Sequence, residues 1–173
     1  MGLKVRIRGI NMYIRDLAKV SDGTFNAARS GIEEAAEYLK DVVVEKIGVY
    51  QPTGGDPGGH GRWKKLKYDT IKKKLRKYGV GDKPLLASGS LKGSFSVIPG
   101  GKGRLSASVG SSSDYLVYHV YGAPGAHVPM RDPIRVTALE EKDMCFQIIE
   151  DAILEEIDKW WWSNGSKNDG YWI

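Results

Sequence analysis

Apolar residues recur at helical spacing along two long stretches of the chain. The first follows Ser21–Thr24, a cluster of helix-capping side chains, and the second covers 138–162, where the opposite face is acidic. Each stretch is predicted to form a long helix with one face in the core. The apolar positions are Phe25, Ala28, Ile32, Ala35, Leu39, Val42, Val43 and Ile47 in the first helix, and Leu139, Met144, Ile148, Ile149, Ile153 and Ile157 in the second.

Shorter stretches alternate with the period of two that is typical of strands. Residues 3–9 alternate apolar and basic side chains, which predicts a first strand. The segments 93–99 and 104–110 alternate serines with apolar residues on both sides of a glycine turn, which predicts a hairpin.

Two segments between these elements have biased compositions. Residues 51–61 contain five glycines and two prolines, and we expect a flexible loop whose glycines supply mobility and nothing more specific. The lysine-rich stretch 62–78 has the spacing of a helix with a narrow apolar face, ending at Gly79. The predicted fold class is therefore α+β: a small antiparallel sheet packed against two long helices plus a shorter basic helix.

Composition adds that the chain is one folded unit. With 173 residues, 41% hydrophobic and 27% charged, residues 1–162 are expected to form a single domain and 163–173 a polar tail with an aromatic tip. The sequence has no signal-peptide core and no apolar run long enough to cross a bilayer, so no membrane contact is expected. The single cysteine, Cys145, is expected to be a small buried apolar residue.

The net charge of +5 is distributed unevenly. Ten basic residues and two acidic ones lie within 62–83, whereas eight acidic residues and two basic ones lie within 140–159. These segments could pair within the fold, pair between subunits, or direct the basic face toward nucleic acid. The candidate DNA-facing residues are Lys64, Lys65, Lys72, Lys73, Lys74, Arg76 and Lys77, interleaved with Trp63, Tyr68 and Tyr78.

The stretch YHVYGAPGAHVPMRDP, 118–133, gathers residue types that can do chemistry. His119 and His127, with Asp114 and Asp132 as oxygen ligands, could hold a metal, but their spacing matches no known ligand pattern. The sequence also lacks a nucleophile elbow, a P-loop and a dinucleotide fingerprint. We therefore expect no metal, no cofactor and no enzyme, and a small hydrolase that uses His119 is kept as the minor alternative.

The same stretch is interpreted as a rigid turn that presents Arg131. Pro129 and Pro133 fix the backbone and disfavour helix on both sides of it. Arg131 is expected to bind a carboxylate in its own neighbourhood, on the closing helix or on a partner. His119 and the tyrosines are expected to pack beneath the turn, and Gly122 and Gly125 to let the chain reverse.

Aromatic residues mark a second candidate contact. On a helix Trp160, Trp161 and Trp162 point about 100° apart, so they cannot all face one core. We expect a partner contact there, with Trp172 in a second aromatic patch, or else folding back onto the same domain.

Three segments in this order resemble the virion morphogenesis, or tail completion, proteins of tailed bacteriophages. They are Trp63–Leu66 with Thr70 and the following lysines, Leu85–Phe95, and Tyr115–Gly122 with Val128–Arg131. The first is similar to the family's tryptophan, leucine and downstream lysines, and the second to its leucine, small-hydroxyl, glycine, leucine, serine stretch. The third is similar to the family's tyrosine-histidine-glycine and Pro-x-Arg pair.

The resemblance implies a structural protein that joins the tail to the filled capsid. It implies a homo-oligomeric ring around the DNA channel, contacts with tail tube, tail terminator or head-connector proteins, and non-specific contact with channel DNA. The implied location is the tail or neck of the virion, and the host cytoplasm during assembly. A DNA-binding protein that uses 62–83 remains the alternative.

Overall fold

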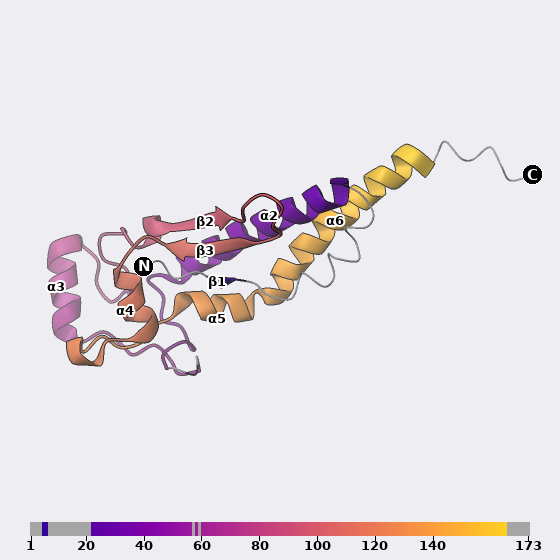
Figure 1. Ribbon diagram of the computed structural model, residues 1–173. Coiled ribbons are helices and arrows are strands. Elements are labelled where there is room, and N and C mark those ends of the chain that lie inside the picture. Colours follow the sequence, from indigo (N-terminus) through magenta and orange to yellow (C-terminus); the bar gives the residue numbers. More distant parts are fainter. Residues whose placement is uncertain (1–4, 7–21, 57, 59, 166–173) are drawn as a thin grey trace, which may run out of the picture.

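The computed structural model describes residues 5–6, 22–56, 58 and 60–165 of the chain, and its elements confirm the predicted α+β class (Figure 1). In chain order they are β1 (Val5–Arg6), α2 (Asp22–Lys46), α3 (Tyr68–Tyr78), β2 (Phe95–Pro99), β3 (Ala107–Ser111), α4 (Tyr115–Tyr121), α5 (Pro133–Glu140) and α6 (Lys142–Gly165). Short 3-10 turns lie at Lys92–Ser94 and Pro124–Ala126.

The two long helices α2 and α6 lie side by side and form the main apolar layer (Figure 1). Their backbones come close at Gly31, where a Cβ atom would lie 2.9 Å from the Cβ atom of Ala152 and 3.0 Å from the Cα atom of Ile149. The buried residues of this layer include Ala28, Ile32, Ala35, Leu39 and Val43 of α2, and Cys145, Ile149 and Ile153 of α6. The predicted helix and the burial of Cys145 are confirmed, whereas Phe25 and Val42 of the predicted core face are only partly buried.

The predicted second helix is interrupted. α5 ends at Glu140 and α6 begins at Lys142, so the continuous helix expected over 138–162 is wrong at this junction. Leu139 and Met144 flank the break and are 64% and 45% exposed, so neither belongs to the core as predicted. α6 also continues to Gly165, so it includes the first three residues of the expected tail.

The sheet has the strand order β1-β3-β2, and all neighbours are antiparallel. The predicted hairpin is confirmed: Val97 of β2 pairs with Val109 of β3, and Val109 also pairs with Val5 of β1. Phe95, Ala107 and Val109 are buried in one cluster with the apolar face of α2. The rest of the predicted first strand lies outside the described residues.

Helix α3 lies at the end of the molecule opposite the last turns of α6 (Figure 1). None of its residues is buried, and Leu75 on the predicted apolar face is 57% exposed. It begins at Tyr68, later than expected, and ends as predicted at Gly79, which adopts the left-handed conformation with φ 67°.

Helix α4 was not foreseen in the sequence. Its residues Leu116 and Val120, four positions apart, are buried against the core, whereas Tyr115, Tyr118 and Tyr121 are exposed. The tyrosines therefore do not pack beneath the following turn as expected.

Candidate functional site

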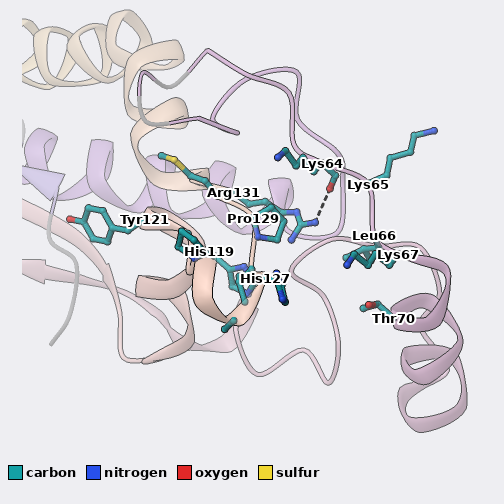
Figure 2. A pocket seen from close by; sticks show the side chains of 15 residues that line it. Lys64, Lys65, Leu66, Lys67, Thr70, His119, Tyr121, His127, Pro129 and Arg131 are labelled. Atoms are coloured by element: carbon teal, nitrogen blue, oxygen red, sulfur yellow. Dashed lines mark hydrogen bonds between the residues drawn. The ribbon is translucent and has the colours of Figure 1, made fainter.

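Arg131 connects three segments that are distant in the sequence. Its backbone N–H donates to the carbonyl oxygen of His119 at 2.6 Å, and its Nη2 donates to the carbonyl oxygen of Lys64 at 2.7 Å (Figure 2). Only 3% of the residue is exposed, so the guanidinium group lies inside the fold. The partner is a backbone carbonyl rather than the expected carboxylate, and among the described residues Arg131 forms no ion pair.

Asp132 has a different role from the one its neighbourhood suggested. Its Oδ1 atom accepts from the backbone N–H groups of Ile134 and Arg135, both at 3.0 Å, which caps the first turn of α5. Pro133 therefore occupies the first helical position, where proline is favoured because no N–H is needed there. The expectation that Pro133 would prevent helix after Arg131 is wrong.

The glycine-rich loop is anchored to this segment at Gly54. The carbonyl oxygen of Gly54 accepts from the N–H of Asp132 at 2.9 Å, and the residue has φ +80°. An added Cβ atom would lie 2.6 Å from Cγ2 of Val136 and 2.8 Å from the carbonyl oxygen of Asp132. This glycine is required for a close approach, which corrects the expectation that the glycines supply mobility alone.

The chain reversal after α4 is a tight loop. Ala123 and Val128 exchange two backbone hydrogen bonds, of 2.9 and 3.0 Å, around the turn at Pro124–Ala126. Gly122 has φ +71° and His127 has φ +54°, so these two residues take the left-handed conformations. Gly122 thus acts as predicted, whereas Gly125 does not have a positive φ.

A pocket of about 810 Å³ lies between this loop and the extended segment that precedes α3 (Figure 2). One wall comes from the 64–70 segment and the other from α4 and the loop that follows it. None of the described residues that line it is acidic. The charged, histidine and hydroxyl residues of the lining are Lys64, Lys65, Lys67, Thr70, His119, His127 and Arg131.

Burial shifts the titration of the inner groups. The pKa of His119 is lowered to about 4 by burial and by the positive charge of Arg131, so the imidazole is neutral near pH 7. Burial also lowers the pKa of Arg131. Three buried side-chain nitrogens in this region have no hydrogen-bond partner among the described residues: Nδ1 of His119, Nε of Arg131 and Nε1 of Trp63.

Tyr50 also anchors the basic wall of the pocket. Its hydroxyl accepts from the backbone N–H of Leu66 at 2.9 Å and donates to the carboxylate of Asp82. Burial, together with the hydrogen bond to Asp82, raises the pKa of Tyr50. The 64–67 segment is therefore held by two hydrogen bonds, from Leu66 to Tyr50 and from Arg131 to Lys64.

The predicted DNA-facing residues separate into two groups. Lys64 and Lys65 line the pocket, and Lys65 extends away from its centre in Figure 2. The exposed side chains of α3 form the second group, and Lys74 instead turns back to donate to the carbonyl oxygen of Lys83. The exposed cations of α3 are Lys72, Lys73, Arg76 and Lys77.

The predicted aromatic contact lies far from the pocket. Trp160, Trp161 and Trp162 are 51%, 63% and 75% exposed near the end of α6, at the other end of the molecule from α3 (Figure 1). The structure does not bring these tryptophans together with Arg131. Trp172 lies outside the described residues.

The two histidines of the candidate metal site lie in one pocket without the candidate aspartates. His119 and His127 both line the pocket, but Asp114 and Asp132 do not. Within the described part of the chain no three His, Cys, Asp or Glu side chains are grouped to hold a metal ion. The described helices also include none that is long and apolar enough to span a membrane.

Trp63 is the residue here that the sequence misplaced. The sequence pattern places Trp63 on the narrow apolar face of the basic helix, but in the structure it lies before α3 and is buried. Its backbone N–H donates to the carbonyl oxygen of Gln51 at 3.1 Å, and its Nε1 lies 3.2 Å from the position of a Cβ on Gly54. A tryptophan between a glycine-rich stretch and a lysine run is the sequence signal that indicates this arrangement.

No protein-family model matches the sequence, and neither a curated protein nor a solved structure matches it. The resemblance to the phage family therefore rests on the three quoted segments.

Proposed function

We propose that this protein is a structural subunit of a tailed-phage virion that completes the tail or neck and joins the tail to the head. It acts through protein contacts, as a homo-oligomeric ring around the DNA channel, and without catalysis. It is present in the host cytoplasm during assembly and then in the virion. Tail tube, tail terminator and head-connector proteins are its candidate partners.

One observation carries the proposal: the three segments of the resemblance are parts of a single structural unit. Lys64 of the first segment and Arg131 of the third are joined by the 2.7 Å hydrogen bond. Leu91 and Phe95 of the second segment share one buried cluster with Leu116 and Val120 of the third. Segments that serve one fold are expected to occur together and in a fixed order, as they do in this sequence.

The two ends of the molecule support a role in assembly. One end presents the exposed cations of α3, and the other presents the three tryptophans of α6 beside acidic side chains. Exposed tryptophans are typical of the centres of protein interfaces, where they contribute much of the binding energy. A subunit with chemically different ends can contact different neighbours, as a connector must.

The test is the assembly of phage that lack the protein. We expect filled heads and separate tails in electron micrographs, and normal infectious particles would contradict the proposal. A triple variant, W160A/W161A/W162A, should give the same defect while melting at the temperature of the native protein. The matched control is L139A/M144A/F146A, which removes three exposed apolar side chains near the α5–α6 junction and should support normal assembly.

The second candidate function is DNA binding by the basic segment 62–83. It is favoured by the side chains of Lys72, Lys73 and Lys77, which are exposed and form no ion pair with any described residue. Affinity for duplex DNA measured against salt separates the two. A specific binder keeps an affinity on the order of nanomolar near physiological salt, whereas a cationic channel surface loses affinity steeply.

A further inference from the structure

We infer that the pocket between the 64–70 segment and the loop after α4 is a binding site for a phosphate group, with Arg131 as its anchor. The site is formed by residues from two parts of the chain, and the Arg131–Lys64 hydrogen bond holds them together (Figure 2). This inference goes beyond the proposed virion role and does not rest on it.

The charge of the lining selects anions. Four permanent cations line the pocket, Lys64, Lys65, Lys67 and Arg131, and the described lining residues include no carboxylate. Charges of one sign in a concave site raise the local concentration of the opposite ion, because the low-dielectric walls focus the field. An unoccupied cluster of this kind is self-repelling, and an anion relieves that repulsion.

Arg131 is the preorganised residue of the site. Only 3% of the residue is exposed, and the hydrogen bond from Nη2 to the carbonyl oxygen of Lys64 holds the guanidinium group in place. Its Nε atom has no hydrogen-bond partner among the described residues. A buried cation with an unused donor is costly unless an anion or another acceptor reaches it, and a guanidinium group matches the geometry of phosphate oxygens.

His119 adds a neutral hydrogen-bonding group. It lines the same pocket, and its Nδ1 atom is buried without a partner among the described residues. A neutral imidazole carries one N–H donor, which can contact a phosphate oxygen without adding to the repulsion among the cations. The pocket thus offers both charged and neutral donors.

The size and walls of the pocket indicate that the phosphate belongs to a larger molecule. A volume of about 810 Å³ is many times that of a single phosphate ion and lies in the range of sites for organic ligands. Leu66, Tyr121 and Pro129 supply apolar surface beside the cations. Such walls accept a sugar ring or a base, so a nucleotide or the DNA backbone is the expected source of the phosphate.

The experiment is a titration of the full-length protein with inorganic phosphate and, separately, with a short DNA duplex at constant ionic strength. Binding is followed by calorimetry and by amide shifts in NMR spectra. We expect saturable binding, with shifts concentrated at residues 64–70 and 119–131. The pocket variant K64Q/K67Q should weaken binding about tenfold, because two charged donors are removed.

The control variant is K102Q/R104Q, which removes the same charge from exposed positions between β2 and β3, outside both the pocket and α3, and should weaken binding less than about twofold. If the pocket substitutions lower the affinity for inorganic phosphate, the inference is supported for a free or small phosphate compound. If they lower the affinity for the DNA duplex alone, it is supported for the nucleic acid backbone. Equal weakening by the two variants, or no saturable binding of either probe, overturns it. Acetate competing as well as phosphate also overturns it, in favour of a carboxylate site.

Arg131 itself is tested by Arg131→Lys, with thermal melting to verify the fold. This variant keeps the charge and loses the planar donor group, so phosphate affinity should fall although the net charge is unchanged. An assembly defect without any effect on phosphate binding would contradict this inference and leave the virion role standing. If the protein binds phosphate but is dispensable for joining heads to tails, this inference stands and the virion role is contradicted.

Discussion

The two halves of the molecule are held together by different forces. Between α2 and α6 the contacts are apolar: Leu39 and Val43 are buried in the same cluster as Ile149 and Ile153. Around Arg131 they are mostly hydrogen bonds to backbone carbonyl oxygens, those of Gly54 and Lys64 in loops and that of His119 in α4.

The two kinds of contact differ in how their contribution to stability is distributed among residues. Apolar packing spreads over many side chains, and each contributes a fraction of the stability. The hydrogen-bonded half depends on a few groups in fixed positions, each of which is costly to leave without a partner once buried. In the apolar half, a substitution should therefore lower the free energy of unfolding according to the side-chain volume that it removes. In the hydrogen-bonded half, the loss should depend on whether the substitution displaces a buried donor or acceptor.

The largest effect is expected from Leu39→Ala in the apolar half. The side chain is almost fully buried, so its truncation leaves a cavity and should lower the free energy of unfolding by about 4 kcal/mol. Urea denaturation measures this change. A loss below about 1 kcal/mol would show that the α2–α6 layer can collapse around the cavity, contrary to tight packing.

Gly54→Ala should have the next largest effect, in the hydrogen-bonded half. The new methyl group meets Val136 and the carbonyl oxygen of Asp132, and the residue must keep its positive φ, so about 3 kcal/mol is expected. Amide exchange should accelerate at Trp63 and Asp132 more than in α2. Gly125→Ala is the matched control, since no atom lies within 4 Å of its Cβ position, and it should leave both measurements unchanged.

Acidification should weaken the hydrogen-bonded half by a smaller amount. The pKa of His119 is about 4 in the folded protein and 6.5 in the unfolded chain, so the unfolded state binds the proton more readily. The contribution of His119 is complete above pH 6.5 and is lost as the pH falls toward 4, by on the order of 2 kcal/mol. His119→Gln should remove this part of the pH dependence, measured as the difference between the two unfolding curves. Parallel curves would contradict the buried neutral imidazole.

The smallest effect is expected from Leu75→Ala on α3. This leucine is mostly exposed and no residue of its helix is buried, so unfolding should change by less than about 0.5 kcal/mol. The comparison with Leu39→Ala uses the same chemical change at a buried and an exposed site. A loss above about 2 kcal/mol would indicate that α3 packs on the core more closely than its exposure implies.

The sequence predicted the apolar half well. In α2 and in the β2–β3 hairpin, the apolar side chains that recur at regular spacing are mostly those that become buried. The apolar pattern in the sequence therefore predicts the packing directly. The break between α5 and α6 was missed because Leu139 and Met144 continue the apolar pattern but remain exposed.

The hydrogen-bonded half could not be predicted in the same way. The Arg131 guanidinium pairs with a carbonyl oxygen 67 residues away, and a carbonyl group is present at every position, so no residue type marks the partner. The sequence marks the turn around Arg131 as a contact site, but the carboxylate partner that it predicts is replaced by a backbone carbonyl. Gly54 was likewise one of several glycines until the position of Val136 distinguished it.

The placement of the tryptophans gives the protein its own optical reporters. Trp63 is enclosed beside Gly54, whereas Trp160, Trp161 and Trp162 are open to solvent on α6. In a Trp172→Phe background, a soluble quencher such as iodide should therefore reach the α6 rings and leave Trp63 emitting at shorter wavelength. A neighbour that docks on α6 would reduce the quenching of the α6 tryptophans. Loosening of the glycine-rich loop would increase the quenching of Trp63, so one unlabelled sample reports both events.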